Sequence, residues 1–435
     1  MADNLAWVIS VNMGYGHQRT AYPLKDLAPD KKIIFANDYF SIPQKDKKIW
    51  QSSQKSYEAI SRAKRIPVIG NFIFKVYDSF QKILSYYPKR DLSRPTLNLM
   101  TTYSVIKRGW GRDLIEKLKI QNSKIKKNLP LISTFYVPAF MAEEFDYPGE
   151  IFCVVCDADV ARHWAPLKPF QSRIKYLAPT RRVVDRLRFY GVKRQNIFFT
   201  GYPLPKENLG ENLEILKSDL ANRLLNLDPQ KQYFKKYKPV VDETIGKLPE
   251  KSNHLLTIMF SVGGAGAQKE LGFKIFQGLS PQIKQGKLKL ILSAGIKNGI
   301  KEYFEKKISR EYFSKSPSSG GVEILYQEKI DNYFKEFNEK LRKTDILWTK
   351  PSELSFYSAL GVPIIIAPPI GSQEDFNQRW LIKSGFGVNQ ENIKYINQWF
   401  FDWLNQGFLA ESAMQGFIEG DKFGTLNIKK LITGL

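Results

Sequence analysis

Cysteine and histidine are scarce in this chain, and long apolar runs are missing. The 435 residues include two cysteines, Cys153 and Cys156, and three histidines. The Cys-x-x-Cys spacing permits a redox or metal site, but no second ligand pair accompanies it, and the surrounding apolar run favours buried structural thiols. No stretch reaches the roughly 18 consecutive apolar residues of a membrane span, and no charged leader precedes an apolar run. We therefore expect a cytoplasmic protein.

Acidic residues are the minority among the charged ones, and the imbalance is uneven. The chain has 66 Lys and Arg against 43 Asp and Glu, which gives a net charge of +23. Residues 1–200 alone hold 34 Lys and Arg against 17 Asp and Glu. The excess is densest over 45–130, where aromatic residues are interspersed. This suits an anionic membrane surface; nucleic acid and ordinary solvated helices are the alternatives. We expect membrane contact, with Ile69, Phe72, Ile73 and Trp110 inserting, and no nucleic-acid partner.

Strand-like and helical segments alternate along the chain, whose length exceeds one typical core. The predicted strands are 5–11, 32–36, 130–135, 151–155, 174–177 and 197–199, then 255–260, 288–293, 322–325, 345–348 and 363–367. Alternation implies parallel sheets. We expect Rossmann-like domains over 1–205 and 253–393, a linker or insertion over 206–252, and helices over 394–435 that return to the first domain. Two such domains facing a cleft make the α/β fold called GT-B.

Polar residues follow the last two predicted strands. Segment 349–353 (Thr-Lys-Pro-Ser-Glu) reads as strand, turn and helix start at Ser352, and a helix N-terminus binds anions. Glu353 is placed to accept hydrogen bonds from ribose hydroxyls, and Lys350 to screen a diphosphate. Three further polar residues follow the next strand, at the edge where open α/β sheets bind ligands: Gln373, Glu374 and Asn377. This order of residues suits a nucleotide sugar. The hexose is expected at the loop that carries Gln373, Glu374 and Asn377.

A glycine loop opens the second half. Gly263, Gly264 and Gly266 follow a predicted strand, and such loops bind phosphate through backbone N–H groups. Tyr326 and Gln327 end another strand; Tyr326 is a candidate either to stack on a base or to join the core.

The first half opens on a strand, Trp7–Val11, followed by the turn Gly14-Tyr15-Gly16-His17. This start resembles the Gly-x-Gly-His motif of the monogalactosyldiacylglycerol synthases and processive diacylglycerol glucosyltransferases, and more distantly the peptidoglycan N-acetylglucosaminyltransferase. Further short matches occur in the same order: Phe152–Asp157 with His163-Trp164, Gly201-Tyr202-Pro203, the glycine loop, and Pro351-Ser352-Glu353. Together they cover most of the chain. The glycine loop lacks the Ser-Gln pair of the peptidoglycan enzyme, which leaves its hydroxyl contact to phosphate in doubt.

The resemblance implies an inverting, metal-independent glycosyltransferase without a cofactor. The donor would be a UDP-sugar, with its uracil at Tyr326 and Gln327. The acceptor would be a membrane lipid hydroxyl, diacylglycerol first and a polyprenyl-linked glycan second, at the inner face of the cell membrane.

His17 is the predicted general base. It follows a glycine turn at the carboxyl end of a strand, the edge of a parallel sheet that binds ligands, and Gly14 and Gly16 allow the backbone to approach a substrate. Asp157, His163 and Trp164 are expected on the acceptor side, with Asp157 or His163 next in line as base.

Three other interpretations stay open. Asp157-Ala158-Asp159 also fits the metal-binding Asp-x-Asp of GT-A glycosyltransferases, although GT-A has no use for the second-half motifs. A non-hydrolysing UDP-sugar epimerase shares the two-domain layout but needs acid/base carboxylates. A catalytically dead basic binding module is disfavoured by the joint presence of His17 and Glu353.

Overall fold

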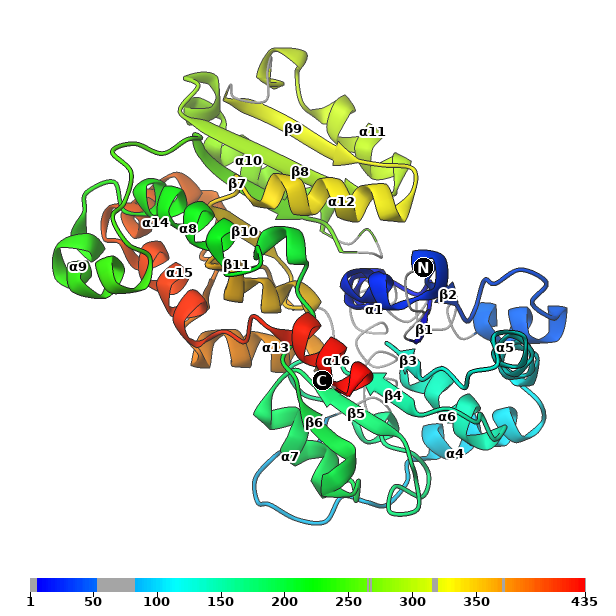
Figure 1. Ribbon diagram of the computed structural model, residues 1–435. Helices are drawn as coiled ribbons and strands as arrows, with labels where there is room; N and C mark the ends of the chain where they lie inside the picture. Colours follow the sequence, from blue (N-terminus) through cyan, green and yellow to red (C-terminus); the bar gives the residue numbers. More distant parts are fainter. Residues whose placement is uncertain are drawn as a thin grey trace. The chain divides into compact units, whose positions relative to one another are not determined.

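The computed structural model describes residues 6–52, 83–263, 266, 268–314, 320–369 and 372–434. The chain forms two compact units, of which unit 1 comprises Met1–Pro203, Ile370–Asn377 and Phe423–Leu435, and unit 2 comprises Leu204–Pro369 and Gln378–Lys422. Within the described ranges each unit contains one six-stranded sheet, and every strand pairing is parallel. The α/β class with two Rossmann-like units is therefore confirmed (Figure 1).

The sheet of unit 1 has the order β2-β1-β3-β4-β5-β6. Its strands are β1 Trp7–Ser10, β2 Ile34–Phe35, β3 Leu131–Ser133, β4 Ile151–Val154, β5 Lys175–Ala178 and β6 Ile197–Phe199. Its helices are α1 Tyr15–Ala21, α4 Leu97–Lys107, α5 Arg112–Ile125, α6 Tyr136–Glu144, α7 Arg181–Phe189 and α16 Gly424–Thr433. β1, β3 and β4 are neighbours, so the loops at their carboxyl ends meet at one edge.

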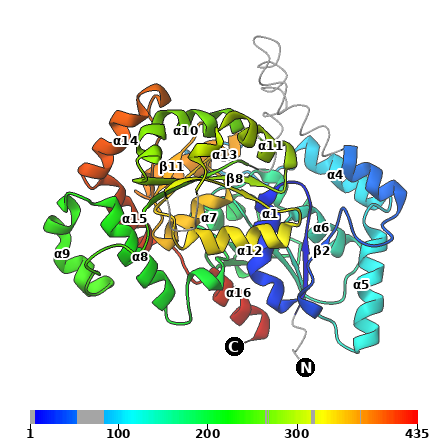
Figure 2. The ribbon, with the colours of Figure 1, turned by 90° about the horizontal axis from the view of Figure 1, so that it is seen from above.

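The sheet of unit 2 has the order β12-β11-β10-β7-β8-β9. Its strands are β7 Leu256–Ser261, β8 Leu288–Gly295, β9 Gly321–Tyr326, β10 Ile346–Thr349, β11 Ile364–Ile366 and β12 Gly387–Asn389. Helices α10 Lys269–Lys284 and α11 Asn298–Lys307 lie on one side of β8, and α12 Ile330–Leu341 lies on the other (Figure 2). β12 was not expected from the sequence. Ser261 of β7 pairs with Thr349 of β10, so their following loops share an edge.

Segment 206–252, expected as a linker or insertion, contributes two helices to unit 2: α8 Glu214–Leu227 and α9 Gln232–Thr244. Leu216, Leu220 and Leu224 of α8 are buried. Arg223 is buried too, and its guanidinium donates to the carbonyls of Thr344, Leu360, Gly361 and Leu341. These bonds satisfy a buried charge, so α8 is part of the packed unit.

The C-terminal segment is divided between the units, which differs from the expected return of 394–435 as a whole. Helices α14 Ile396–Asn405 and α15 Phe408–Glu419 group with unit 2, because Trp399 of α14 packs on Trp348 of β10, 5.6 Å between ring centroids. Only α16 and its lead-in group with unit 1. Ile428 of α16 is fully buried in a cluster with Val8, Leu24 and Phe152. Among the described residues, no helix is both long and apolar enough to cross a membrane.

Candidate active site

Three neighbouring strands of unit 1 deliver polar residues to the carboxyl edge of the sheet. His17 lies in α1, which is separated from the end of β1 by four residues. Thr134 follows β3 and Asp157 follows β4. Gly14 precedes α1 with a φ of +117°, and a Cβ built there would meet nothing within 4 Å. The turn therefore needs glycine for its backbone conformation, and it leaves open space beside it.

The ring of His17 is held in one orientation. Its Nδ1 lies 2.8 Å from the carbonyl oxygen of Thr134. A carbonyl can only accept, so Nδ1 carries the proton and Nε2 carries the lone pair. The Thr134 hydroxyl donates its single proton to the His17 carbonyl at 2.9 Å and lies 3.0 Å from the Ser10 hydroxyl, from which it can accept. Burial lowers the pKa of His17 to about 4, against the Thr134 hydrogen bond, which raises it. The ring is thus a neutral base at pH 7.

Aromatic side chains surround His17. Phe135 lies 4.7 Å and Trp164 6.3 Å from the His17 ring between centroids. They belong to a cavity of about 440 Å³ within unit 1. Its lining residues are Met13, His17, Ile49, Trp50, Ser52, Asn98, Thr101, Thr102, Val105, Trp110, Phe135, Tyr136, Val137, Asp157, His163, Trp164 and Gln373. We call this cavity the His17 pocket. It brings together His17, Asp157, His163 and Trp164, which the sequence assigned to one acceptor site.

His163 is buried in the pocket wall with its ring 5.1 Å from that of Tyr136. Burial and then the neighbouring Arg162 lower its pKa to about 4. The third histidine, His254, lies in unit 2, where its Nε2 is 3.0 Å from the buried Asp345 carboxylate. It therefore fixes the start of β7 to β10.

Three residues predicted to bind the donor belong to unit 1, whereas the other predicted donor residues belong to unit 2. Gln373 lines the His17 pocket. The Asn377 amide nitrogen donates to Asp157 at 3.0 Å, and its oxygen accepts from the Ala158 N–H at 2.8 Å. Both residues belong to the first part of helix α13 (Ser372–Lys383), which groups with unit 1 up to Asn377. The contact of Asn377 with the hexose stays a prediction; in the structure its amide braces the loop that carries Asp157. Glu374 lies half-buried between them on α13.

The Asp-x-Asp pair does not form a metal site here. Both oxygens of the buried Asp159 accept from Arg186, at 2.9 and 2.8 Å, and this ion pair has an exposed fraction near zero. Asp157 instead faces Asn377 and the His17 pocket. Across the described ranges, no group of three or more His, Cys, Asp or Glu side chains is arranged to hold a metal ion.

In unit 2, several predicted donor residues meet at the carboxyl edge of the sheet. Gly263 follows β7 and Lys350 follows β10. A Cβ built on Gly263 would lie 2.6 Å from Lys350 Cε and 3.5 Å from its Nζ, so the lysine side chain extends across the glycine loop. Gly266 adopts a φ of +72°, close to Lys297 and Ile300; Gly264 lies outside the described residues. The edge therefore places ammonium groups beside a glycine loop, which suits phosphate.

Ser352 and Glu353 begin a helical segment, as expected, but it is a 3₁₀ helix over Glu353–Leu360 that ends at Gly361. Glu353 is buried, with 8% of its surface exposed. The Ser352 hydroxyl makes no capping hydrogen bond.

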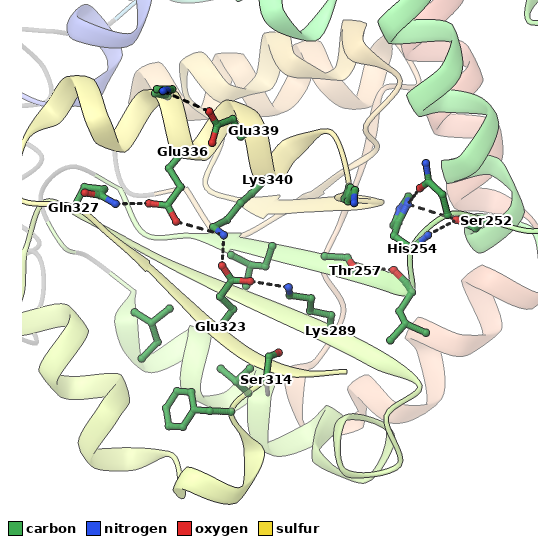
Figure 3. Close-up of a pocket in the computed structure, with 18 of the residues that line it drawn as sticks. Ser252, His254, Thr257, Lys289, Ser314, Glu323, Gln327, Glu336, Glu339 and Lys340 are labelled. Atoms are coloured by element: carbon green, nitrogen blue, oxygen red, sulfur yellow. Dashed lines mark hydrogen bonds and ion pairs between the residues drawn. The ribbon is translucent and has the colours of Figure 1, made fainter. Parts of the chain in front are cut away.

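Tyr326 is the last residue of β9, and Gln327 follows it. Their side chains have different partners. The Lys301 ammonium lies 5.2 Å from the Tyr326 ring. The Gln327 side chain donates to Glu336 of α12 at 2.5 Å, and its backbone N–H donates to Gly295. The Gln327 amide is thus held toward α12 (Figure 3).

Unit 2 has a cavity of its own, of about 1120 Å³. It runs between α12 and the sheet, from His254 to Gln327 (Figure 3). Glu323 of β9 pairs with Lys289 at 2.7 Å and also with Lys340 of α12, which pairs with Glu336 at 3.3 Å. Although burial opposes it, hydrogen bonds from both lysines lower the pKa of Glu323. The network fastens α12 to β8 and β9, and its charges are already paired.

Comparisons with known proteins give a distant likeness of fold. Residues 248–316 match a family model described as "Domain of unknown function (DUF6938)". No curated protein matches the sequence. Similar solved structures include a UDP-GlcNAc 2-epimerase from Neisseria meningitidis bound to UDP-GlcNAc, with 9% identity and a TM-score of 0.45 over 84% of this chain and 88% of that one. Another is MurG from Acinetobacter baumannii, with 13% identity and a TM-score of 0.43 over 87% and 96%. Identities this low do not define a substrate.

Sequence reasoning missed Thr134, which orients the His17 ring, and several residues that line the His17 pocket. Thr134 and Phe135 directly follow β3, and this position at the carboxyl edge was the available signal. Trp50 enters from residues 44–52, which are helical. Its contact with Phe135, at 6.4 Å, has no local signature in the sequence.

Proposed function

We propose that the protein is an inverting, metal-independent glycosyltransferase that moves a hexose from a UDP-sugar to a membrane lipid hydroxyl. Diacylglycerol is the first candidate acceptor and a polyprenyl-linked glycan the second. The order of short motifs in the sequence supports a nucleotide-sugar enzyme, and the two Rossmann-like units provide two sheet edges of the kind that binds ligands.

The state of His17 carries the proposal. A neutral imidazole with Nδ1–H bound to Thr134 presents Nε2 as a base, and aromatic side chains line the pocket around it. In the proposed step, Nε2 takes the proton of the acceptor hydroxyl as its oxygen bonds to the anomeric carbon. The bond from that carbon to the diphosphate oxygen breaks, and UDP leaves with the electron pair. One displacement inverts the anomeric centre.

The edge of unit 2 offers what the donor requires. Lys350 beside Gly263 would counter the charge that develops on the departing diphosphate. The buried carboxylate of Glu353 would accept from ribose hydroxyls. Since Asp159 is committed to Arg186, the Asp-x-Asp motif does not support a metal-dependent route.

A peripheral position on an anionic membrane is part of the proposal. Of the apolar residues expected to insert, Ile69, Phe72 and Ile73 lie outside the described residues. Trp110 is buried, at 5% exposure, so its predicted insertion is wrong: the ring packs on Trp50 instead, 4.6 Å between centroids. Helix α4 supports lipid contact in its place, since Leu97 and Met100 are exposed beside pocket-lining Asn98 and Thr101.

The experiment is a panel of labelled nucleotide sugars incubated with the protein and membrane lipid extract, read by mass spectrometry. A sugar-bearing lipid that requires His17 is the expected product. An isomeric nucleotide sugar would favour the epimerase. No product with any donor would refute the proposal.

A further inference from the structure

The Cys156 thiol lies against the ring of His17, and the proposed reaction does not use it. Its Sγ is 3.5 Å from His17 Nδ1 and donates to Asp157 Oδ2 at 3.8 Å. Cys156 is the second residue after β4 and is buried, with 4% of its surface exposed. The sequence predicts buried structural thiols; this one is buried, but it also lies between the proposed base and a carboxylate.

The hydrogen atoms of this group can be placed from its contacts. The Nδ1–H of His17 points to the Thr134 carbonyl, 2.8 Å away, because that oxygen can only accept. Nδ1 therefore has no lone pair for the thiol, and the sulfur faces the N–H as a second and weaker acceptor. The thiol hydrogen is directed to the Asp157 carboxylate. A chain of polar contacts thus runs from the ring through sulfur to a negative charge.

The carboxylate at the end of this chain is held from its other side. Asp157 Oδ1 accepts from the side-chain amide of Asn377 at 3.0 Å. The oxygen of the same amide accepts from the Ala158 N–H at 2.8 Å, and Asn377 is buried. The charge of Asp157 therefore has a fixed position relative to the ring before any substrate binds, which is the condition for electrostatic stabilisation of a transition state.

This arrangement suits a base that is neutral before the reaction and cationic during it. A carboxylate in direct contact with the ring would favour the imidazolium and raise the pKa of His17, whereas burial lowers that pKa to about 4. With the thiol between them, the carboxylate acts on the ring from one side chain further away. Once Nε2 has taken a proton, the ring is positive, and its N–H binds the sulfur and the S–H dipole more strongly. The link therefore stabilises the transition state more than the resting enzyme.

We propose that Cys156 is a positioning residue that connects Asp157 to His17, so that the carboxylate stabilises the imidazolium formed when Nε2 takes the acceptor proton. The inference rests on the proposed function and adds a residue that acts through its base. One proton moves, from the acceptor hydroxyl to Nε2, while the Nδ1–H and S–H hydrogens stay where they are. Cys156 forms no covalent bond with the substrate in this step.

A double-mutant cycle tests the link through the reaction. The kcat/KM for the acceptor is measured at pH 7 in Cys156→Ala, in Asp157→Asn and in the double variant. Each single substitution should lower kcat/KM about tenfold, because either one removes the charge-assisted contact to the ring. The double variant should lose no more than the slower single variant, since groups that act through one contact are not additive. Donor affinity in calorimetry should stay unchanged.

A nitrogen-15 NMR titration tests the link without turnover. The chain has three histidines, and the His17 signal is identified by its absence in His17→Gln. At pH 4.5 a ring with a pKa of about 4 is about a quarter protonated, and a ring whose imidazolium is tenfold weaker is about 3% protonated. Cys156→Ala, Asp157→Asn and the double variant should all show the lower value. His254, in unit 2 against Asp345, is the reference and should give the same signal in every protein.

Three further variants separate the link from packing. Cys156→Ser keeps a donor and an acceptor and should retain about a third or more of the normal kcat/KM. Cys156→Val fills the space without a hydrogen bond and should be as slow as Cys156→Ala. The matched control is Cys153→Ala, at the other cysteine, which lies in β4 and is fully buried; it should leave kcat/KM and the His17 signal unchanged. Circular dichroism checks the fold, and if Cys156→Ala does not fold, the comparison of Cys156→Ser with Cys156→Val decides.

Normal kcat/KM in Cys156→Ala, recovery of activity in Cys156→Val, or an additive loss of about a hundredfold in the double variant would overturn the inference, and so would an unchanged His17 titration. The two proposals fail separately. The expected titration shifts without sugar transfer from any donor would count against the glycosyltransferase only. Sugar transfer with an unchanged titration and additive losses would count against this inference only.

Discussion

The acid side of the pH–rate profile tests the state of His17 directly. Its pKa falls from an ordinary 6.5 to about 4, chiefly through burial, which corresponds to about 3 kcal/mol against the imidazolium form. At pH 5.5 such a ring is only about 3% protonated, whereas an ordinary histidine is about 90% protonated. A base of this kind stays unprotonated at pH values where most histidine bases have already taken up a proton.

The assay is kcat/KM for the acceptor between pH 4 and pH 8, because kcat/KM reports the pKa of groups in the enzyme before the acceptor binds. We expect a flat profile down to about pH 5 and a fall with its midpoint near the pKa of about 4. His17→Gln should lower the rate on the order of a hundredfold across the range. A midpoint near 6.5, or a His17→Gln variant with a tenth of the normal rate or more, would refute the assignment of the base.

The folded state must be monitored in the same buffers. His17 and His163 both have folded-state pKa values lowered to about 4, so the unfolded chain binds more protons as the pH falls below 6.5. Stability is full above that value and declines between about pH 6.5 and pH 4, by about 2 kcal/mol for each ring at pH 5. Circular dichroism at each pH separates this loss from protonation of the base.

Three further predictions concern the donor edge and the membrane. Glu353→Ala should lower the affinity for UDP-sugar by roughly tenfold or more, through loss of charge-assisted hydrogen bonds to ribose; unchanged affinity in calorimetry would remove Glu353 from the site. Gly263→Ala should displace Lys350, since the new Cβ would lie 2.6 Å from Lys350 Cε, and should weaken UDP binding by about tenfold. Gly299→Ala, where an added Cβ meets nothing within 4 Å, is the control and should bind UDP normally. Anionic vesicles should bind the protein, less at high salt but still measurably, while neutral vesicles bind poorly; tight RNA binding without vesicle binding would contradict the lipid acceptor.

Strand positions were predictable because parallel buried strands appear as short apolar runs. Segments such as 151–155 and 288–293 stand out from polar flanks and became β4 and β8. β12 is Gly-Val-Asn, which carries no such run, and it owes its pairing with β11 to tertiary context. The burial of Arg223 could not be predicted either. A charged residue in a polar segment gives no sign in the sequence that backbone carbonyls will surround it.

The site was only partly predictable. His17 was accessible because glycines and the end of a strand mark it locally. Thr134 lies 117 residues away from His17, and single-sequence patterns do not report contacts of that range. Gln373 and Asn377 were assigned by the strand that precedes them, β11. The first turns of α13 belong to unit 1 instead, and no local feature of the sequence indicates that.

Helix α16 has a consequence for the order in which the protein can fold. Ile428 completes a core cluster whose other members include Ala6, Val8 and Leu24 from the first residues of the chain, and Asn427 donates to the Thr200 carbonyl. During synthesis, unit 1 must wait for α16 to leave the ribosome, although all six strands of its sheet emerge first. Residues 1–203 alone would expose apolar surface and tend to aggregate. Expression of unit 1 as a soluble fragment should therefore require α16, supplied by fusion or as a separate peptide.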